Sequence, residues 1–188
     1  MKKILIGVFA FLLLAVGLII IFLPATTHIE RTIMIDAPPA VAYASTVDLR
    51  EFHKWSPWTG RDPNANYEFS DPSSGVNASM SWSGNEQVGE GKMTITKAFE
   101  NEGIELDLDF GSQGGATSAW LFEQNGLGTK ATWAFDTGHG FNPIARVFGA
   151  FFMDGMIGPD YEKGLQNLKD HCEAKQTDIA SDEDAATP

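Results

Sequence analysis

The chain has 188 residues and a formal net charge of −12, and 43% of its residues are hydrophobic. Nucleic-acid binding needs clustered lysines and arginines, so this acidic balance argues against nucleic acid as a partner and against electrostatic adhesion to anionic lipid. Cys172 is the only cysteine, which excludes an internal disulfide and a zinc cluster. The length suffices for one domain plus an attachment.

An apolar segment without charged side chains, Ile4–Leu23, follows two lysines at the start of the chain. Twenty residues at helical rise span about 30 Å, the thickness of a bilayer core, so residues 1–25 are predicted to be a transmembrane anchor. The lysines mark the cytoplasmic end, which predicts a single pass through a bacterial inner membrane with the domain on the periplasmic side. The alternative is a cleaved signal peptide, although its apolar region is usually only ~7–15 residues long. Cleavage after residue 25 therefore stays open.

A first strand is predicted at residues 27–35, where alternating isoleucines share one face of the extended chain. Arg31 interrupts this apolar face. Two prolines then end the strand, and two short helices are predicted at residues 39–47 and 48–55.

Six further strands are predicted from alternating patterns separated by turn residues. They lie at residues 66–70, 76–83, 87–100, 104–110, 116–123 and 129–136. The strand at 104–110 alternates most regularly, with apolar residues on one face and acidic residues on the other. Consecutive hairpins favour an antiparallel meander, so the predicted fold class is α+β.

The C-terminal part of the domain carries an apolar stripe with spacings of three and four residues, which predicts a helix from Asn142 to about His171. Asn142 can cap its start, and Gly158-Pro159 is expected to kink or break it midway. The stripe consists of Ile144, Val147, Phe148, Phe151, Phe152, Met156, Tyr161, Leu165, Leu168 and Cys172. A helix this apolar needs a broad partner, so we expect a curved sheet wrapped around it, with a ligand space between them.

Composition divides the chain into three parts. Residues 1–25 are the predicted anchor and residues 26–173 the folded domain. Residues 174–188 are polar, acidic and without periodicity, and we expect a disordered tail there.

Several short motifs, in this order along the chain, resemble the START-like helix-grip superfamily (SRPBCC), in its bacterial polyketide cyclase/dehydrase-type branch. They are Asp36-Ala37-Pro38-Pro39, Val41-Ala42-Tyr43, Trp55-Ser56-Pro57-Trp58, Gly89-x-Gly91, Gly128-Thr129-Lys130 and the helix from Met156 to Lys169. The resemblance implies an antiparallel sheet that grips the C-terminal helix around an apolar cavity. It also implies binding of lipids, sterols or aromatic compounds, with cyclases or dehydratases as a minority of members.

Aromatic residues are the main candidates for a site, because small-molecule pockets are mostly apolar with a few polar groups. The predicted cavity wall consists of Trp55, Trp58, Trp82, Phe110, Trp120, Trp133, Phe135, Phe148, Phe152 and Met156. His53 and His139 are candidates for polar groups at the cavity mouth. The four histidines show no metal-ligand spacing, and no catalytic residue, metal or cofactor is predicted.

Three functions stay open at this point. The first is a membrane-anchored domain that binds a hydrophobic small molecule or lipid. The second is a cyclase, dehydratase or hydrolase that uses the same cavity, which would need a buried polar pair inside it. The third is a protein-interaction domain, which would have a filled core and an exposed apolar patch.

Overall fold

A curved sheet of seven antiparallel strands is the main element of the structure, a computed structural model that describes residues 2–185 and the side chains of residues 2–178. Its order is β1-β7-β6-β5-β4-β3-β2, so the predicted meander is confirmed and the first strand closes beside the last. The strands are β1 (Thr26–Ile35), β2 (Asn66–Phe69), β3 (Ser79–Ser83), β4 (Glu90–Phe99), β5 (Gly103–Asp109), β6 (Gly115–Asn125) and β7 (Gly128–Gly138).

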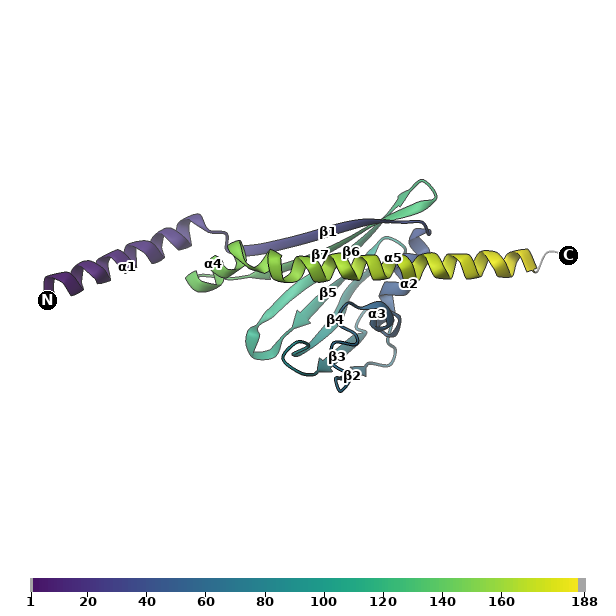
Figure 1. Ribbon diagram of the computed structural model, residues 1–188, viewed down its shortest axis with the longest axis horizontal. Helices are drawn as coiled ribbons and strands as arrows, with labels where there is room; N and C mark the ends of the chain where they lie inside the picture. Colours follow the sequence, from purple (N-terminus) through teal and green to yellow (C-terminus); the bar gives the residue numbers. More distant parts are fainter. Residues whose placement is uncertain (1, 186–188) are drawn as a thin grey trace.

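The helices lie on one face of the sheet and at its ends (Figure 1). They are α1 (Lys2–Phe22), α2 (Pro39–Val47), α3 (Leu49–Trp55), α4 (Pro143–Phe151) and α5 (Met153–Ala185), with one 3-10 turn at Gly111–Gln113. Figure 1 shows α5 running along the sheet, with α1 projecting from the end where α4 lies. This arrangement is the α+β helix-grip fold that the sequence predicts.

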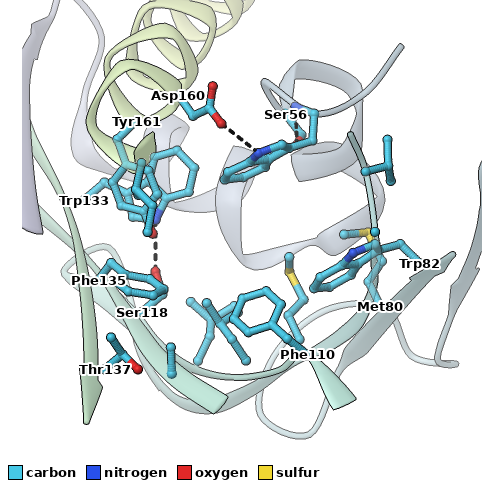
Figure 2. Close-up of a pocket in the computed structure, with 18 of the residues that line it drawn as sticks. Ser56, Met80, Trp82, Phe110, Ser118, Trp133, Phe135, Thr137, Asp160 and Tyr161 are labelled. Atoms are coloured by element: carbon cyan, nitrogen blue, oxygen red, sulfur yellow. Dashed lines mark hydrogen bonds between the residues drawn. The ribbon is translucent and has the colours of Figure 1, made fainter. Parts of the chain in front are cut away.

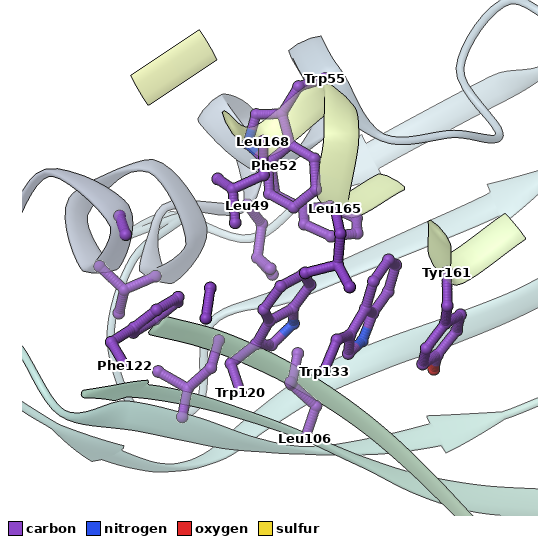
Figure 3. Packing of buried hydrophobic residues seen from close by; sticks show 14 of the residues in the cluster. Leu49, Phe52, Trp55, Leu106, Trp120, Phe122, Trp133, Tyr161, Leu165 and Leu168 are labelled. Atoms are coloured by element: carbon purple, nitrogen blue, oxygen red, sulfur yellow. The ribbon is translucent and has the colours of Figure 1, made fainter. Parts of the chain in front are cut away.

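The second half of the predicted helix stripe forms the centre of the core. Tyr161, Leu165, Leu168 and Cys172 are all buried on the face of α5 that points to the sheet. Figure 3 shows Tyr161, Leu165 and Leu168 against aromatic side chains from α3, β6 and β7. The labelled partners include Phe52, Trp55, Trp120, Phe122 and Trp133. Burial of this stripe fixes α5 along the sheet.

The first half of the stripe lies elsewhere than predicted. The helix breaks at Phe152, which caps the end of α4, and not at Pro159, which lies inside α5. Pro159 removes only the amide that would donate to the carbonyl of Gly155, and because Gly155 is exposed, water can replace that bond. The helix therefore does not break at Gly158-Pro159, where a kink or a break was predicted, and α4 passes beyond the sheet beside α1.

Arg31, the charged residue on the apolar face of the first strand, is there because it pairs with two acidic residues of α5. Its guanidinium donates to Asp154 and to Glu162 of α5, each at 2.9 Å. Gly158 is buried between them, and any side chain there would collide with the Arg31 guanidinium. The arginine thus joins β1 to α5 through two ion pairs.

α1 is a 21-residue helix that is long and apolar enough to cross a membrane, by length and composition. Its C-terminal end is held by Arg146 of α4, a buried side chain that donates to the carbonyl oxygens of Ile20 and, at 3.0 Å, Leu23. The same guanidinium donates to Gly140 at 2.6 and 2.8 Å. A cation at these unpaired carbonyls also opposes the negative end of the helix dipole.

The predicted disordered tail differs from the structure, in which α5 continues as a helix to Ala185. Lys175 donates to Glu51 of α3 at 2.8 Å, so the first turn beyond the predicted domain is tied to the core. A helix that is already nucleated extends at little cost through helix-forming residues. Residues 186–188 of the predicted tail lie outside the described residues.

Two glycines of α5 provide a matched test of packing. A Cβ at Gly164 would lie 2.6 Å from Cζ3 of Trp133, whereas Gly155 has no atom within 4 Å. We expect Gly164→Ala to destabilise the full chain by about 1–3 kcal/mol, because the Trp133 ring is held between two other rings. Gly155→Ala should instead stabilise it by up to about 1 kcal/mol through helix propensity. Urea unfolding in detergent, followed by circular dichroism, measures both, and equal effects would contradict this packing.

The contact between α3 and α5 predicts a pH dependence. Hydrogen bonds from Lys175 and Lys54 lower the pKa of Glu51 from 4.5 to about 2. Because the folded pKa is the lower one, this stabilisation is complete above about pH 4.5 and is lost as the pH falls towards about 2. Glu51→Gln should therefore lower the free energy of unfolding by up to about 1 kcal/mol at pH 7 and by much less at pH 3. The shift of the thermal unfolding midpoint at each pH measures this effect. Glu105→Gln, which breaks a more exposed pair with Lys97, is the control and should have a smaller effect.

Candidate functional site

A cavity of about 450 Å³ lies between the sheet and the helices α3 and α5. Its wall comes mainly from inward-facing residues of β3 to β7, because alternate side chains of each strand point to the same face. Figure 2 shows the lining residues of the sheet below the cavity and those of α5 above it. The apolar wall includes Met80, Trp82, Met93, Leu106, Leu108, Phe110, Ala116, Trp120, Trp133 and Phe135.

A stack of three aromatic rings closes one side of the cavity. Trp120 and Trp133 have ring centroids 4.3 Å apart with planes at 22°, and Trp133 and Tyr161 are 3.8 Å apart at 13°. Trp58 meets Trp133 edge-on at 5.6 Å. Since β6, β7 and α5 each supply one ring of the stack, this wall is rigid and joins the helix to the sheet.

The polar groups near this wall are engaged with one another. The indole N–H of Trp133 donates to Ser118 Oγ at 3.0 Å (Figure 2). Ser118 in turn donates to the carbonyl of Ala134 at 2.9 Å. Burial raises the pKa of the Tyr161 phenol, so the phenol stays protonated. Among the described residues, the partners of Ser118 are an indole N–H, a backbone carbonyl and the protonated phenol of Tyr161, and none of them is a general base that could accept its proton.

The side of the cavity nearest α3 holds two further polar features. Asp160 accepts from the indole of Trp58 at 3.2 Å and from the guanidinium of Arg61. The hydroxyl of Tyr67, which lines the cavity, is buried and has no hydrogen-bond partner among the described residues. An unpaired buried hydroxyl is costly, so this group is available to a polar atom of a ligand.

The rim opposite the helices is formed by the β3–β4 and β5–β6 connections. It includes the exposed residues Glu86, Gln87, Glu90 and Gln113. The helix side of the rim is apolar instead, with Phe148, Met153 and Met156. The cavity therefore has an acidic, hydrated edge and an apolar edge.

The structure brings together eight of the ten predicted wall residues. Trp58, Trp82, Phe110, Trp120, Trp133, Phe135, Phe148 and Met156 line the cavity. Ligand binding by these residues stays a prediction. Sequence reasoning missed Tyr67 and Ser118; for Ser118, the signal was its inward position on β6, two residues before Trp120.

Four predicted site residues lie outside the cavity. Trp55 is buried under α3, where its indole donates to the carbonyl of Ser45 at 2.9 Å. Phe152 lies exposed at the break between α4 and α5. His53 packs against Tyr67 with ring centroids 4.3 Å apart, and His139 is hydrogen-bonded to Thr27 at 2.7 Å. Neither histidine reaches the cavity, because each is engaged in the contact that holds its own loop or helix.

A comparison with known protein families assigns this chain to one of them. The family model described as "Polyketide cyclase / dehydrase and lipid transport" matches residues 26–173. The chain belongs to that family. The match starts at the first strand and ends at the last turn of the buried part of α5, so it covers the whole cavity.

Solved structures agree with this family at the level of the fold. Protein SA2116 of unknown function from Staphylococcus aureus has a TM-score of 0.62 at 12% identity, covering 81% of this chain and 96% of its own. The KanY protein has a TM-score of 0.59 at 20% identity, covering 80% and 99%. The di-domain ARO/CYC protein BexL from the BE-7585A biosynthetic pathway has a TM-score of 0.57 at 20% identity, covering 79% and 50%. A search among curated proteins gave no match.

One hydrogen bond in the cavity wall, from the Trp133 indole to Ser118, can be tested by mutation. Ser118→Ala leaves the buried indole N–H of Trp133 without a partner, which we expect to cost about 1–3 kcal/mol. In a Trp133→Phe background the same substitution should cost clearly less, because no indole N–H remains. Urea unfolding of the full chain in detergent, followed by circular dichroism, gives this double-mutant cycle. Additive losses would contradict the proposed coupling.

Proposed function

We propose that this protein is a membrane-anchored binding domain that holds a hydrophobic small molecule or lipid in the cavity between the sheet and α5. The apolar cavity of about 450 Å³, walled by aromatic and methionine side chains, is the observation that carries the proposal. Cavities of about 300–1,000 Å³ with a few placed polar groups are typical of small-molecule sites. The unpaired Tyr67 hydroxyl would then bind a polar atom at one end of an otherwise apolar ligand.

The anchor in this proposal is α1. Its length and composition suit a bilayer, and none of its residues is buried against the domain. The lysines at positions 2 and 3 favour a cytoplasmic N-terminus, which places the domain on the periplasmic side of a bacterial inner membrane.

An enzymatic function has less support. Ser118, the buried hydroxyl on the cavity wall, has no histidine or carboxylate among its hydrogen-bond partners in the described part of the chain, and Asp160 is paired with Arg61. Neither predicted histidine lines the cavity. A protein-interaction function would call for a filled core, whereas the core of this family member contains an open space.

The proposal is tested with a pair of alanines on β6 that face opposite sides of the sheet. Ala116 lines the cavity, whereas Ala119, three residues along the same strand, has its side chain on the outer face. We expect Ala116→Phe to reduce the binding of N-phenyl-1-naphthylamine, because the new ring fills the cavity, whereas Ala119→Phe should bind like the wild type. Energy transfer from tryptophan to the probe, measured on the full chain in nanodiscs, reports binding near the stack.

Native mass spectrometry of the full chain, with organic extraction of bound molecules, provides the second measurement. A co-purifying lipid or apolar compound that is depleted in Ala116→Phe, but not in Ala119→Phe, would support the proposal and name the ligand class. Equal probe binding by wild type, both variants and empty nanodiscs would overturn it.

A further inference from the structure

An apolar patch on the surface, next to the cavity rim, remains unexplained by the fold. Its members are large hydrophobic side chains with exposed fractions between 40% and 82%. They are Phe141, Ile144, Phe148, Phe151, Phe152 and Met156, which we call the α4 patch. The only charged residue of α4, Arg146, is turned inward and buried. The outer surface of this helix therefore offers no charge to water, which is unusual for a helix on a protein surface.

The α4 patch lies beside the last two turns of α1. A groove between the two helices is lined by Val16 and Ile19 of α1 and by residues of α4 that include Ile144 and Phe148. Val16 precedes Phe22, the end of α1, by six residues, or about 9 Å along a helix. Residues of α4 that border Val16 thus lie level with the interior of α1 and not beyond its end.

This position is fixed and does not depend on the loop between α1 and β1. Arg146 joins α4 to the carbonyl groups of Ile20 and Leu23, and Asn142 caps α4 by accepting from the amides of Ile144 and Ala145. Wherever the end of α1 lies with respect to a bilayer, α4 lies there too.

We propose that the α4 patch is a lipid-docking surface embedded in the bilayer leaflet that holds the C-terminal end of α1. The inference rests on the proposed role of α1 as a membrane anchor. A 21-residue helix is about 31 Å long, close to the ~30 Å of the hydrocarbon core, so Val16 lies inside that core and the neighbouring α4 side chains lie at the same depth. A protein partner would have to displace lipid to reach this surface.

The docking surface is continuous with the cavity. Phe148 lines both the groove beside α1 and the cavity, and Met156 belongs to both the α4 patch and the cavity rim. The apolar edge of the cavity therefore opens towards the leaflet, while the acidic edge at Glu86 and Glu90 lies on the other side of the opening. This apolar continuity would give an acyl chain a path from the bilayer towards the cavity.

Single cysteines with an environment-sensitive fluorophore test the proposal. Ile144→Cys and Phe151→Cys place the NBD probe on the α4 patch, and Val8→Cys places it in the first half of α1, six residues from its start. Leu127→Cys is the matched control, because Leu127 is 95% exposed at the β6–β7 turn. That turn is separated from α4 by the 11 residues of β7, or about 35 Å of strand. Native Cys172 is buried and its pKa is raised to about 11, so it should stay unlabelled, which the wild-type chain verifies.

The full-length variants are reconstituted in phosphatidylcholine vesicles with and without doxyl-labelled phosphatidylcholine. We expect the probes at positions 8, 144 and 151 to lose fluorescence to the doxyl lipid, while the probe at 127 keeps it. Quenching at 8 but not at 144 or 151 would overturn the docking surface and leave the anchor intact. Absence of quenching at 8 would overturn the anchor and the docking surface together. Ligand binding in the cavity, measured by tryptophan energy transfer, is a separate test, and its outcome does not depend on the quenching results.

Discussion

The stack of Trp120, Trp133 and Tyr161 is the contact on which the rest of the structure depends. It joins β6, β7 and α5 through ring centroids 4.3 and 3.8 Å apart, and its edge forms one wall of the cavity. Gly164 lets α5 approach close enough for the stack to form, and Ser118 fixes the orientation of the central ring. A sheet that curves around a helix leaves space in its middle, and rigid rings keep that space from collapsing.

The order and type of most elements follow from local sequence patterns, because strand alternation and turn residues act over a few positions. The strand edges shift by one to three residues, as at the start of β3, where Val76 and Asn77 belong to a turn. The helix break was misplaced because proline is only one influence on a helix. Here the exposed carbonyl of Gly155 tolerates Pro159, whereas the end of α4 follows from how the chain passes beside α1.

The candidate site shows the same limit. Periodicity identifies an apolar face but not what covers it, so it predicts Phe152 on the cavity wall, whereas the residue lies exposed at the break between α4 and α5. Trp55 and Trp58 are three residues apart, yet one is buried under α3 and the other lines the cavity. The unpaired hydroxyl of Tyr67 depends on contacts between distant segments, and no local pattern indicates it.

Three residues, Leu23 to Ala25, separate α1 from β1, and Arg146 makes a second connection between α1 and the domain. Two attachments, one covalent and one through hydrogen bonds, remove the freedom of rotation that a single flexible tether would leave. The domain thus has a fixed orientation relative to α1, and so has the opening of its cavity. If α1 is the membrane anchor that we propose, a domain attached in this way would meet only molecules that diffuse past it in the plane of the membrane.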